Sequence, residues 1–399
     1  PPVTADTDPQ DESPFLDIDT LPDNIRTLLD LNNTGNVGGV PGRSAAPAAE
    51  APLLQVVNTD DLNSIRVEDS SGNGTAKVFG VPVRYADDEG ETHFIDTSMA
   101  GESLLTSLID GYDYRNAANS FSVQYSKKPD KGIRVDKAFT MAVYNPEKEK
   151  LPKGYTDQTT EGYGRMVYPQ AFGEHTYIEY INTNTGVKEN IVLEENTGRN
   201  RFDFVFASEE YLPVLTEDGL TVQIVRKDNP EEIFYRLTSL YVYDSYQPEA
   251  TGPVEEEPSR EPVFVGPGTA EYAEEELPET MGPAPVKHYT EDNHYEVEAL
   301  GDGKYRITSV VSADFLNSPD TVYPVTIDPS LGSTDSNSQD SYVWEAEPDG
   351  KYGSLNYIRF GKDNGGKIYG YHRFNQLPAL PDKVNITDGW LKFTFRSGQ

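Results

Sequence analysis

Residues 185–206 read TGVKENIVLEENTGRNRFDFVF, and they decide the fold class that the sequence predicts. Every second position of residues 202–206 is Phe, the period of two that is typical of a strand with one buried face. A Gly-bearing turn separates this run from GVKENIVL, a strand pattern that Lys188 and Glu189 interrupt. We expect both charged residues to occupy exposed positions of a sheet that does no chemistry.

The same period of two continues along the chain from about Asn63. In KVFGVPVRY, residues 77–85, the odd positions from 79 onward are Phe, Val, Val and Tyr, and ADDEGE supplies a turn before HFID. LTVQIV and IFYRL flank RKDNPEE, and HYEVEA and KYRITSVV flank LGDG, so each pair predicts a hairpin. Helical spacing is confined to LPDNIRTLLDLN and ESLLTSLID. The sequence therefore predicts an all-β fold of antiparallel sheets and hairpins with very little helix.

Composition divides the chain into three parts. Residues 1–60 are an acidic Pro- and Ala-rich N-terminal segment that contains one short predicted helix. Residues 61–331 form a β-rich domain, which an acidic Pro- and Glu-rich insertion interrupts at residues 247–285. Residues 332–399 form a separate C-terminal unit with both tryptophans of the chain. The insertion has too few apolar residues to offset its ordering entropy, so we expect a linker there.

The net charge of −34 limits the classes of partner. Residues 1–60 carry −8 and residues 247–285 carry −9, so the two acidic segments together hold half of the total. Nucleic-acid binding requires clustered Lys and Arg, so we expect no nucleic-acid partner. No stretch approaches the roughly 20 apolar residues of a membrane span. Cysteine is absent, which excludes disulfides and thiolate metal sites.

Residue types that carry catalysis form no recognisable motif in this sequence. The five histidines lack metal-ligand spacing, and neither a nucleophile elbow nor a phosphate-binding glycine loop occurs. Carboxylates are too abundant to nominate a pair for glycoside hydrolysis. DLNNTGNVGGVPG resembles a calcium loop but has Pro41 at the place of the ligating Glu. We expect no cofactor, and the alternative is calcium at Asp335 and Asp340 in STDSNSQDS.

Aromatic residues are concentrated in residues 341–399, where eleven of them accompany a net charge of +2. The C–H faces of sugar rings stack on Tyr and Trp side chains, so this region predicts carbohydrate binding. The expected contacts are Tyr342, Trp344, Tyr369, Tyr371 and Trp390. Arg359 and Arg373 are interleaved with them and are expected to bind polar or acidic groups. The alternative is that strand alternation places half of these aromatics in a sandwich core.

Five blocks of the sequence resemble a known family. They are, in order, YPQAFGEHTYIEYINTNTGVKENIVL, FDFVF, SADFLNSPDTVYPVTIDPS, DSYVWEAEPDGKYGSLNYIRFG and YHRFNQLPALPDKVNITDGWLKFTF. They are similar to the N-terminal region of bacterial secreted, wall-associated proteins of the Rhs/YD-repeat type, running into a DNRLRE domain. The resemblance covers roughly residues 60–245 and 286–399. DNRLRE domains are β-sandwiches related to carbohydrate-binding modules, so it implies a partial β-sandwich at the C-terminal end.

The resemblance implies a secreted or wall-associated bacterial protein that is not an enzyme. It implies binding to a polysaccharide or cell-wall glycan and the presentation of a downstream domain. The DNRLRE-like part stops at Gln399, short of the usual extent of that domain. The missing strands are expected from a longer chain, from self-association or from a partner chain by β-augmentation. Two alternatives stay open: edge-strand assembly into a filament or the cap of a toxin shell, and a polysaccharide-active enzyme.

Overall fold

The computed structural model describes residues 15–16, 20–29, 55–57, 61–68, 74–246, 288–290, 292–329, 331–333, 338–350, 361–363 and 366–374. The protein is mostly β, with 49% strand and 8% helix, and its sheets are antiparallel, so the predicted fold class is confirmed. The two segments with helical spacing form α1 (Asp23–Leu29) and α2 (Leu104–Asp110). A third short helix is α3 (Ala313–Asn317).

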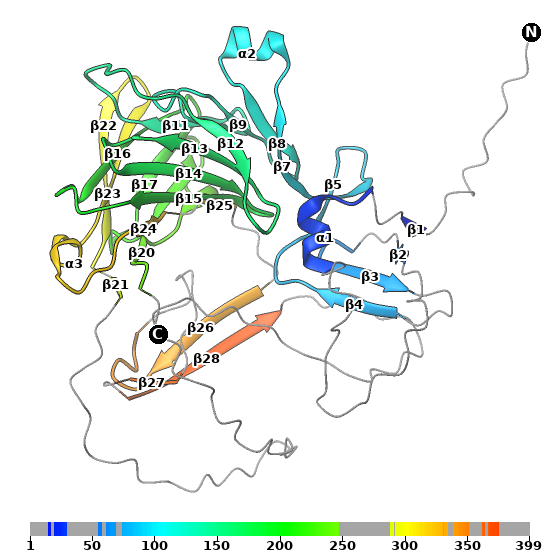
Figure 1. The fold of residues 1–399 in the computed structure, drawn as a ribbon. Helices are drawn as coiled ribbons and strands as arrows, with labels where there is room; N and C mark the ends of the chain where they lie inside the picture. The colour runs from blue at the N-terminus through cyan, green and yellow to red at the C-terminus, as the bar shows by residue number, and fades with distance from the viewer. Residues whose placement is uncertain are drawn as a thin grey trace, which may run out of the picture.

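Two large sheets form the main body of the protein (Figure 1). The first has eight strands, in the spatial order β22 (His294–Gly301), β23 (Lys304–Val310), β16 (Arg201–Ala207), β11 (Phe139–Val143), β10 (Ile133–Val135), β9 (Val123–Tyr125), β8 (Tyr114–Ala118) and β7 (Asp96–Gly101). Both hairpins predicted from turn sequences are present, because β22 pairs with β23 and, in the second sheet, β18 pairs with β19.

The second sheet has eleven strands. Along its main path lie β12 (Tyr155–Gln158), β13 (Gly164–Pro169), β14 (Thr176–Asn182), β15 (Gly186–Leu193), β25 (Leu331–Ser333), β19 (Ile233–Leu237), β18 (Val222–Arg226) and β17 (Tyr211–Leu215). Off this path lie β24 (Val325–Asp328), β20 (Tyr241–Tyr243) and β21 (Tyr289–Thr290). The predicted start of the C-terminal unit at residue 332 falls within β25, which pairs with β15 and β19 of this sheet.

The two sheets share one apolar core, to which alternate residues of their strands contribute. On β16 the three phenylalanines are buried and the residues between them are half-buried, as the period of two predicts. The ring of Phe172 packs edge-on against Phe202 and Phe204, with centroids 5.2 and 5.4 Å apart. The edges of the two sheets also contact each other, β22 with β17 at one side and β7 with β12 and β13 at the other, so the sandwich is closed on both sides.

The expectation that Glu189 lies exposed in water is wrong. Strand β15 is interior to its sheet, between β14 on one side and β24 and β25 on the other. Glu189 is in register with Tyr180, so its side chain faces the shared core and is only 1% exposed. Lys188, on the opposite face, is half-buried and forms an ion pair of 3.2 Å with buried Asp328.

A smaller β unit precedes the main body. Its four-stranded sheet has the order β1 (Phe15–Leu16), β2 (Gln55–Val57), β3 (Ser64–Glu68) and β4 (Gly74–Val78), and a separate hairpin pairs β5 (Arg84–Ala86) with β6 (Thr92–Phe94). Buried side chains of α1 and these strands form a separate core. The expected boundary at residue 60 falls inside this sheet, since β2 pairs with β3.

The alternation predicted for residues 77–85 is interrupted, because β4 ends at Val78 and β5 begins at Arg84. The intervening residues bond to the loop before β3 instead: the Phe79 N–H donates to the Asn63 carbonyl, 2.8 Å, and the Val83 N–H donates to the Leu62 carbonyl, 2.7 Å. Pro82 lacks the N–H that a continuous strand would use at that position.

A three-stranded sheet contains the described residues of the C-terminal region. Its order is β26 (Ser338–Trp344), β28 (Gly366–Phe374) and β27 (Gly361–Asp363), so the longest strand lies in the middle. This sheet carries four of the aromatic residues that the sequence analysis proposes for carbohydrate binding.

Candidate functional site

The register of β26 against β28 divides these aromatics between two faces of the sheet. Val343 lies opposite Tyr369, and Trp344 lies opposite Ile368. Because neighbouring residues of a strand point to opposite faces, Tyr342, Trp344 and Ile368 share one face, and Val343, Tyr369 and Tyr371 share the other. On the first face Tyr342 and Ile368 are buried, so this is the packed side of the sheet.

The other face of β28 presents an exposed row of three side chains, Lys367, Tyr369 and Tyr371, which we call the tyrosine strip. Tyr369 is 49% exposed and Tyr371 is 59% exposed. Residues two apart on a strand are about 7 Å apart, so the rings lie in line along β28. The strip combines two aromatic surfaces with one cation, which suits a ligand with apolar C–H faces and an anionic group.

The other predicted contacts divide into three groups. Tyr342 is buried and belongs to the packed side, as the alternative of a sandwich core predicts, while Trp344 is half-buried on that same side. Arg373 and the calcium candidate Asp340 lie in β28 and β26, where the backbone is described and their side chains are not. Trp390, Arg359 and the second calcium candidate, Asp335, lie outside the described residues.

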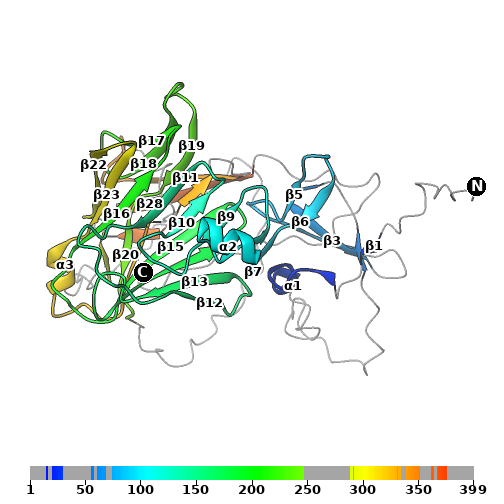
Figure 2. The ribbon, with the colours of Figure 1, turned by 90° about the horizontal axis from the view of Figure 1, so that it is seen from above.

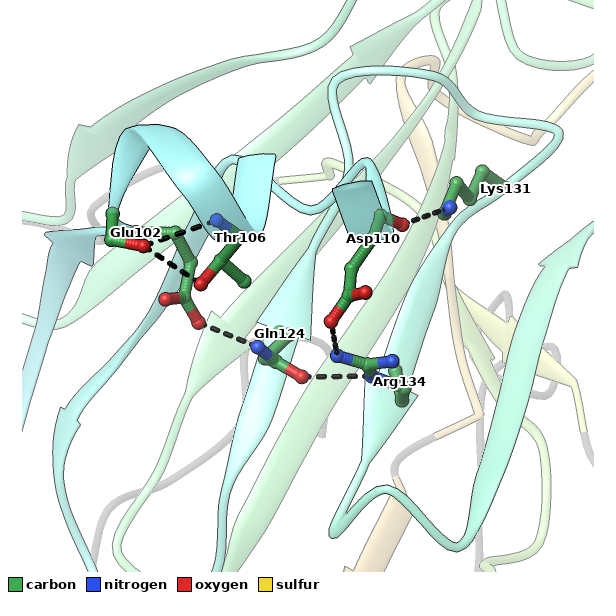
Figure 3. A network of polar contacts seen from close by, with 7 residues as sticks. Glu102, Thr106, Asp110, Gln124, Lys131 and Arg134 are labelled. Carbon is green, nitrogen blue, oxygen red and sulfur yellow. Dashed lines mark hydrogen bonds and ion pairs between the residues drawn. The ribbon is translucent and has the colours of Figure 1, made fainter. Parts of the chain in front are cut away.

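A polar cavity of about 440 Å³ lies between α2 and strands β8 to β10. Its lining includes Glu102, Asp110, Arg115, Asn116, Gln124 and Arg134. Figure 3 shows how most of these side chains are held: Gln124 donates to Glu102, 2.6 Å, and accepts from the Arg134 Nε, 2.8 Å. Arg134 also donates to Asp110, 3.1 Å. Since these side chains use their hydrogen-bonding groups on one another, we assign the lining of the cavity a structural role, as a polar network that joins the helix to the sheet.

Sequence reasoning missed this cavity, because its side chains come from a helix and three strands without a motif. The available signal was the helical spacing of ESLLTSLID followed by the cation-rich turn SKKPDKG. Neither segment alone specifies that Arg134 reaches Asp110 across the sheet.

Buried carboxyl groups form a second set of unusual side chains. The Oε2 atom of Glu189 has no hydrogen-bond partner among the described residues. Burial, opposed by a hydrogen bond with Tyr180 and assisted by the charge of Asp328, raises the pKa of Glu189 to about 8. At neutral pH this carboxyl is therefore mostly protonated. It faces the core, and the 440 Å³ cavity does not include it.

Two other buried carboxylates have partners. Glu179 accepts from Arg165 Nη1, 2.8 Å, and from Asn190 Nδ2, 2.7 Å. Asp244 lies 2.9 Å from the Nδ1 of His288 and accepts the Val322 N–H, also 2.9 Å. The Glu179 contacts join the consecutive strands β13, β14 and β15, and the Asp244 contacts join segments that are distant in the sequence, so we assign both sets to stability.

Among the residues that the structure describes, one group of side chains could hold a metal ion. Ligand atoms of Asp87, Glu91 and His93, on the β5–β6 hairpin, all lie within 4.8 Å of one another. Asp87 already accepts the Glu91 N–H and bonds His93 Nε2, both at 2.8 Å, and the His93 bond holds the pKa of Asp87 below its ordinary value. These bonds close the hairpin turn, which explains why the three side chains lie close together without a metal ion.

No helix in the described part of the chain is long and apolar enough to cross a membrane. Comparisons with protein-family models, with curated proteins and with solved structures each found no match to this chain.

Proposed function

We propose that the protein is a non-catalytic, surface-exposed bacterial β scaffold that binds an acidic polysaccharide or cell-wall glycan through the tyrosine strip. The observation that carries the proposal is the exposed row of Lys367, Tyr369 and Tyr371 on one face of β28. Exposed aromatic rings in line on a strand are costly to leave in water, and a sugar polymer covers them without requiring a deep pocket.

The charge distribution supports an acidic ligand at this place. The chain is strongly acidic, but residues 341–399 carry a net charge of +2. At physiological ionic strength, charges more than about 8 Å apart are largely screened, so the local cation matters more than the total. Lys367 lies on the same face of β28 as the two rings, and backbone alternation puts position 373, an Arg, in line with them.

The non-catalytic part of the proposal is supported by where the carboxyl groups lie. The carboxyl with the most perturbed pKa, Glu189, faces the core between two sheets, where a polymer cannot reach it. The acidic residues that line the cavity, Glu102 and Asp110, are each bonded within the network under α2. Glycoside hydrolysis needs one carboxyl free to donate a proton and a second free to attack or activate water.

The test is a binding screen of the full chain against acidic and neutral polysaccharides, followed by affinity measurements with the best ligand. The Tyr369→Ala/Tyr371→Ala variant is expected to bind at least about tenfold more weakly, which corresponds to about 1.4 kcal/mol. Tyr155→Ala is the matched control, because Tyr155 is 52% exposed on β12, in a different sheet. Lys367→Ala should weaken binding to acidic polymers more than to neutral ones.

Absence of binding by the folded protein to any polysaccharide would contradict the proposal, as would equal binding by the wild type and the double tyrosine variant. Product formation in the same incubations, measured as new reducing ends, would contradict its non-catalytic part.

A second candidate function is assembly. Strands β26 and β27 are the outer strands of the three-stranded sheet, and an outer strand is a template for pairing with another chain. Light scattering after size-exclusion chromatography distinguishes the two functions. Growth into oligomers that persists in the Tyr369→Ala/Tyr371→Ala variant supports assembly, and a monomer at all concentrations opposes it.

A further inference from the structure

Helix α2 is turned with its apolar side toward solvent. Leu104, Leu105, Leu108 and Ile109 are between 67% and 77% exposed, and no residue of the helix is buried. At 3.6 residues per turn these four side chains cover an arc of about 140°. The half-buried residues Thr106, Ser107 and Asp110 occupy the opposite side, which faces the sheet. A surface helix ordinarily has the reverse arrangement.

Specific bonds hold α2 in this orientation. Ser103 caps the helix by accepting the Thr106 N–H, 3.1 Å, and Ser107 donates to Asp113, 3.0 Å. Arg134 binds the Asp110 carboxylate, and Lys131 donates to the Asp110 carbonyl at the end of the helix (Figure 3). Because the polar side is fixed to β10 and its turn, the apolar side is presented outward as a rigid surface.

The turn next to α2 belongs to a locally basic region. Residues 126–132 and 144–154 contain six Lys against three acidic residues, a net charge of +3 in a chain of −34. The two segments are joined: the Gly154 N–H donates to the Lys127 carbonyl, 2.8 Å. The exposed lysines of these segments are Lys128, Lys148, Lys150 and Lys153. The helix and its flanks add Glu102, Asp110 and Asp113, whose carboxylates are bonded to Gln124, Arg134 and Ser107, so the exposed lysines are the cations that lie beside the apolar side chains.

We propose that this end, the apolar side of α2 with its basic loops, docks on an anionic phospholipid surface. Insertion of apolar side chains combined with basic residues at the headgroups is how interfacial helices bind membranes. Four side chains fall well short of the roughly 20–30 residues that each partner contributes to a stable protein interface. The helix also projects beyond the ends of β7 and β8, a convex shape that reaches a flat surface (Figures 1 and 2). This binding is separate from the glycan site.

The negative net charge of the whole chain does not prevent such docking. Residues 1–60 and 247–285 carry half of the net charge, and at physiological salt a charge is largely screened beyond about 8 Å. The attraction therefore depends on the charges next to α2, and it should weaken as salt is raised.

The test is co-sedimentation of the full chain with two kinds of vesicle, phosphatidylcholine alone and an equal mixture of phosphatidylcholine and phosphatidylglycerol. We expect binding to the mixed vesicles and a fall of at least about tenfold in partitioning for Leu104→Ser/Leu108→Ser. The matched control is Val214→Ser/Leu300→Ser, which removes two exposed apolar side chains elsewhere. Lys148→Glu/Lys150→Glu should weaken binding to the mixed vesicles by a similar factor without affecting the melting temperature.

Three results would overturn the proposal: no sedimentation with either vesicle, wild-type partitioning by Leu104→Ser/Leu108→Ser, or equal binding to both vesicles at low salt. A concentration-dependent dimer of the wild type that this leucine variant abolishes would instead assign the face to a second copy of the chain. Because polysaccharide binding is measured on the same proteins, failure of the lipid proposal and failure of the glycan proposal are distinguishable.

Discussion

Glu189 gives the sharpest prediction about stability. In an unfolded chain its carboxyl ionises near pH 4.5, and in the folded protein burial raises the pKa to about 8. Between these two values the folded state keeps a proton that the unfolded state has released. The free energy of unfolding therefore falls as pH rises from about 4.5 to about 8, and this contribution is constant above that range.

The size of the effect follows from the two pKa values. Each pH unit inside the window changes the free energy of unfolding by about 1.4 kcal/mol. At pH 7 the carboxyl therefore destabilises the fold by roughly 3 kcal/mol relative to a side chain that stays neutral. Between about pH 5 and about pH 8, the contribution of this carboxyl to the free energy of unfolding changes by roughly 4 kcal/mol. The Glu189→Gln variant is neutral in both states and nearly isosteric, so it removes this pH dependence.

Denaturant unfolding of the wild type and of Glu189→Gln at several pH values measures the difference. We expect similar stability near pH 5 and a more stable variant by roughly 3 kcal/mol or more near pH 8. Comparing the two proteins at each pH cancels the contribution of every other titrating group. Glu195→Gln, at an exposed position just after β15, is the control and should follow the wild type. Parallel pH profiles for wild type and Glu189→Gln would refute the reasoning.

Two more substitutions, one of them with a control, test the packing of the sandwich. Gly132 has a positive φ, and Gly132→Ala places a Cβ 2.1 Å from the Met141 carbonyl oxygen. Urea unfolding should therefore show a free energy of unfolding lower by roughly 3 kcal/mol or more. The control is Gly198→Ala, which has a positive φ but open space around it and should lower that free energy by about 1 kcal/mol. Phe202→Ala empties a fully buried site against Phe172 and should lower the free energy of unfolding by roughly 3–5 kcal/mol; a loss below about 1 kcal/mol would contradict that packing.

Local pattern was enough to predict the fold class and several elements. The Phe alternation of residues 202–206 specifies a strand with one buried face, and β16 has that burial pattern. The turn sequences RKDNPEE and LGDG each join two apolar runs, and both hairpins formed. In these cases the pairing partners are close in sequence, so the information lies within one short segment.

The burial of Glu189 depends on contacts that no local pattern contains. Strand β15 pairs on one side with β24, more than 130 residues further along the chain, and this pairing makes it an interior strand. Alternation along β15 puts Glu189 on the same face as Val187, Ile191 and Leu193, but only the packing of the two sheets makes that face a closed core.

Helix α2 was predicted from its spacing, but its orientation was not. Amphipathic spacing predicts that Leu104 and Leu108 face the protein, and the structure places them outward. Arg134, on a separate strand, binds the Asp110 carboxylate and so holds the polar side of α2 against the sheet. For the C-terminal aromatics, the sequence supplied only a group of candidates, and the register between β26 and β28 separates exposed Tyr369 and Tyr371 from buried Tyr342.

In the proposed complex, a sugar polymer lies on the rings of Tyr369 and Tyr371. Nuclear magnetic resonance of the full chain with labelled tyrosine rings tests it most directly, during titration with a soluble acidic oligosaccharide. The signals of Tyr369 and Tyr371 are assigned as those that the Tyr369→Ala and Tyr371→Ala variants lack. We expect these signals to shift saturably and the signal of Tyr155 to stay in place. Shifts confined to other tyrosines, or no shift at saturating oligosaccharide, would contradict it.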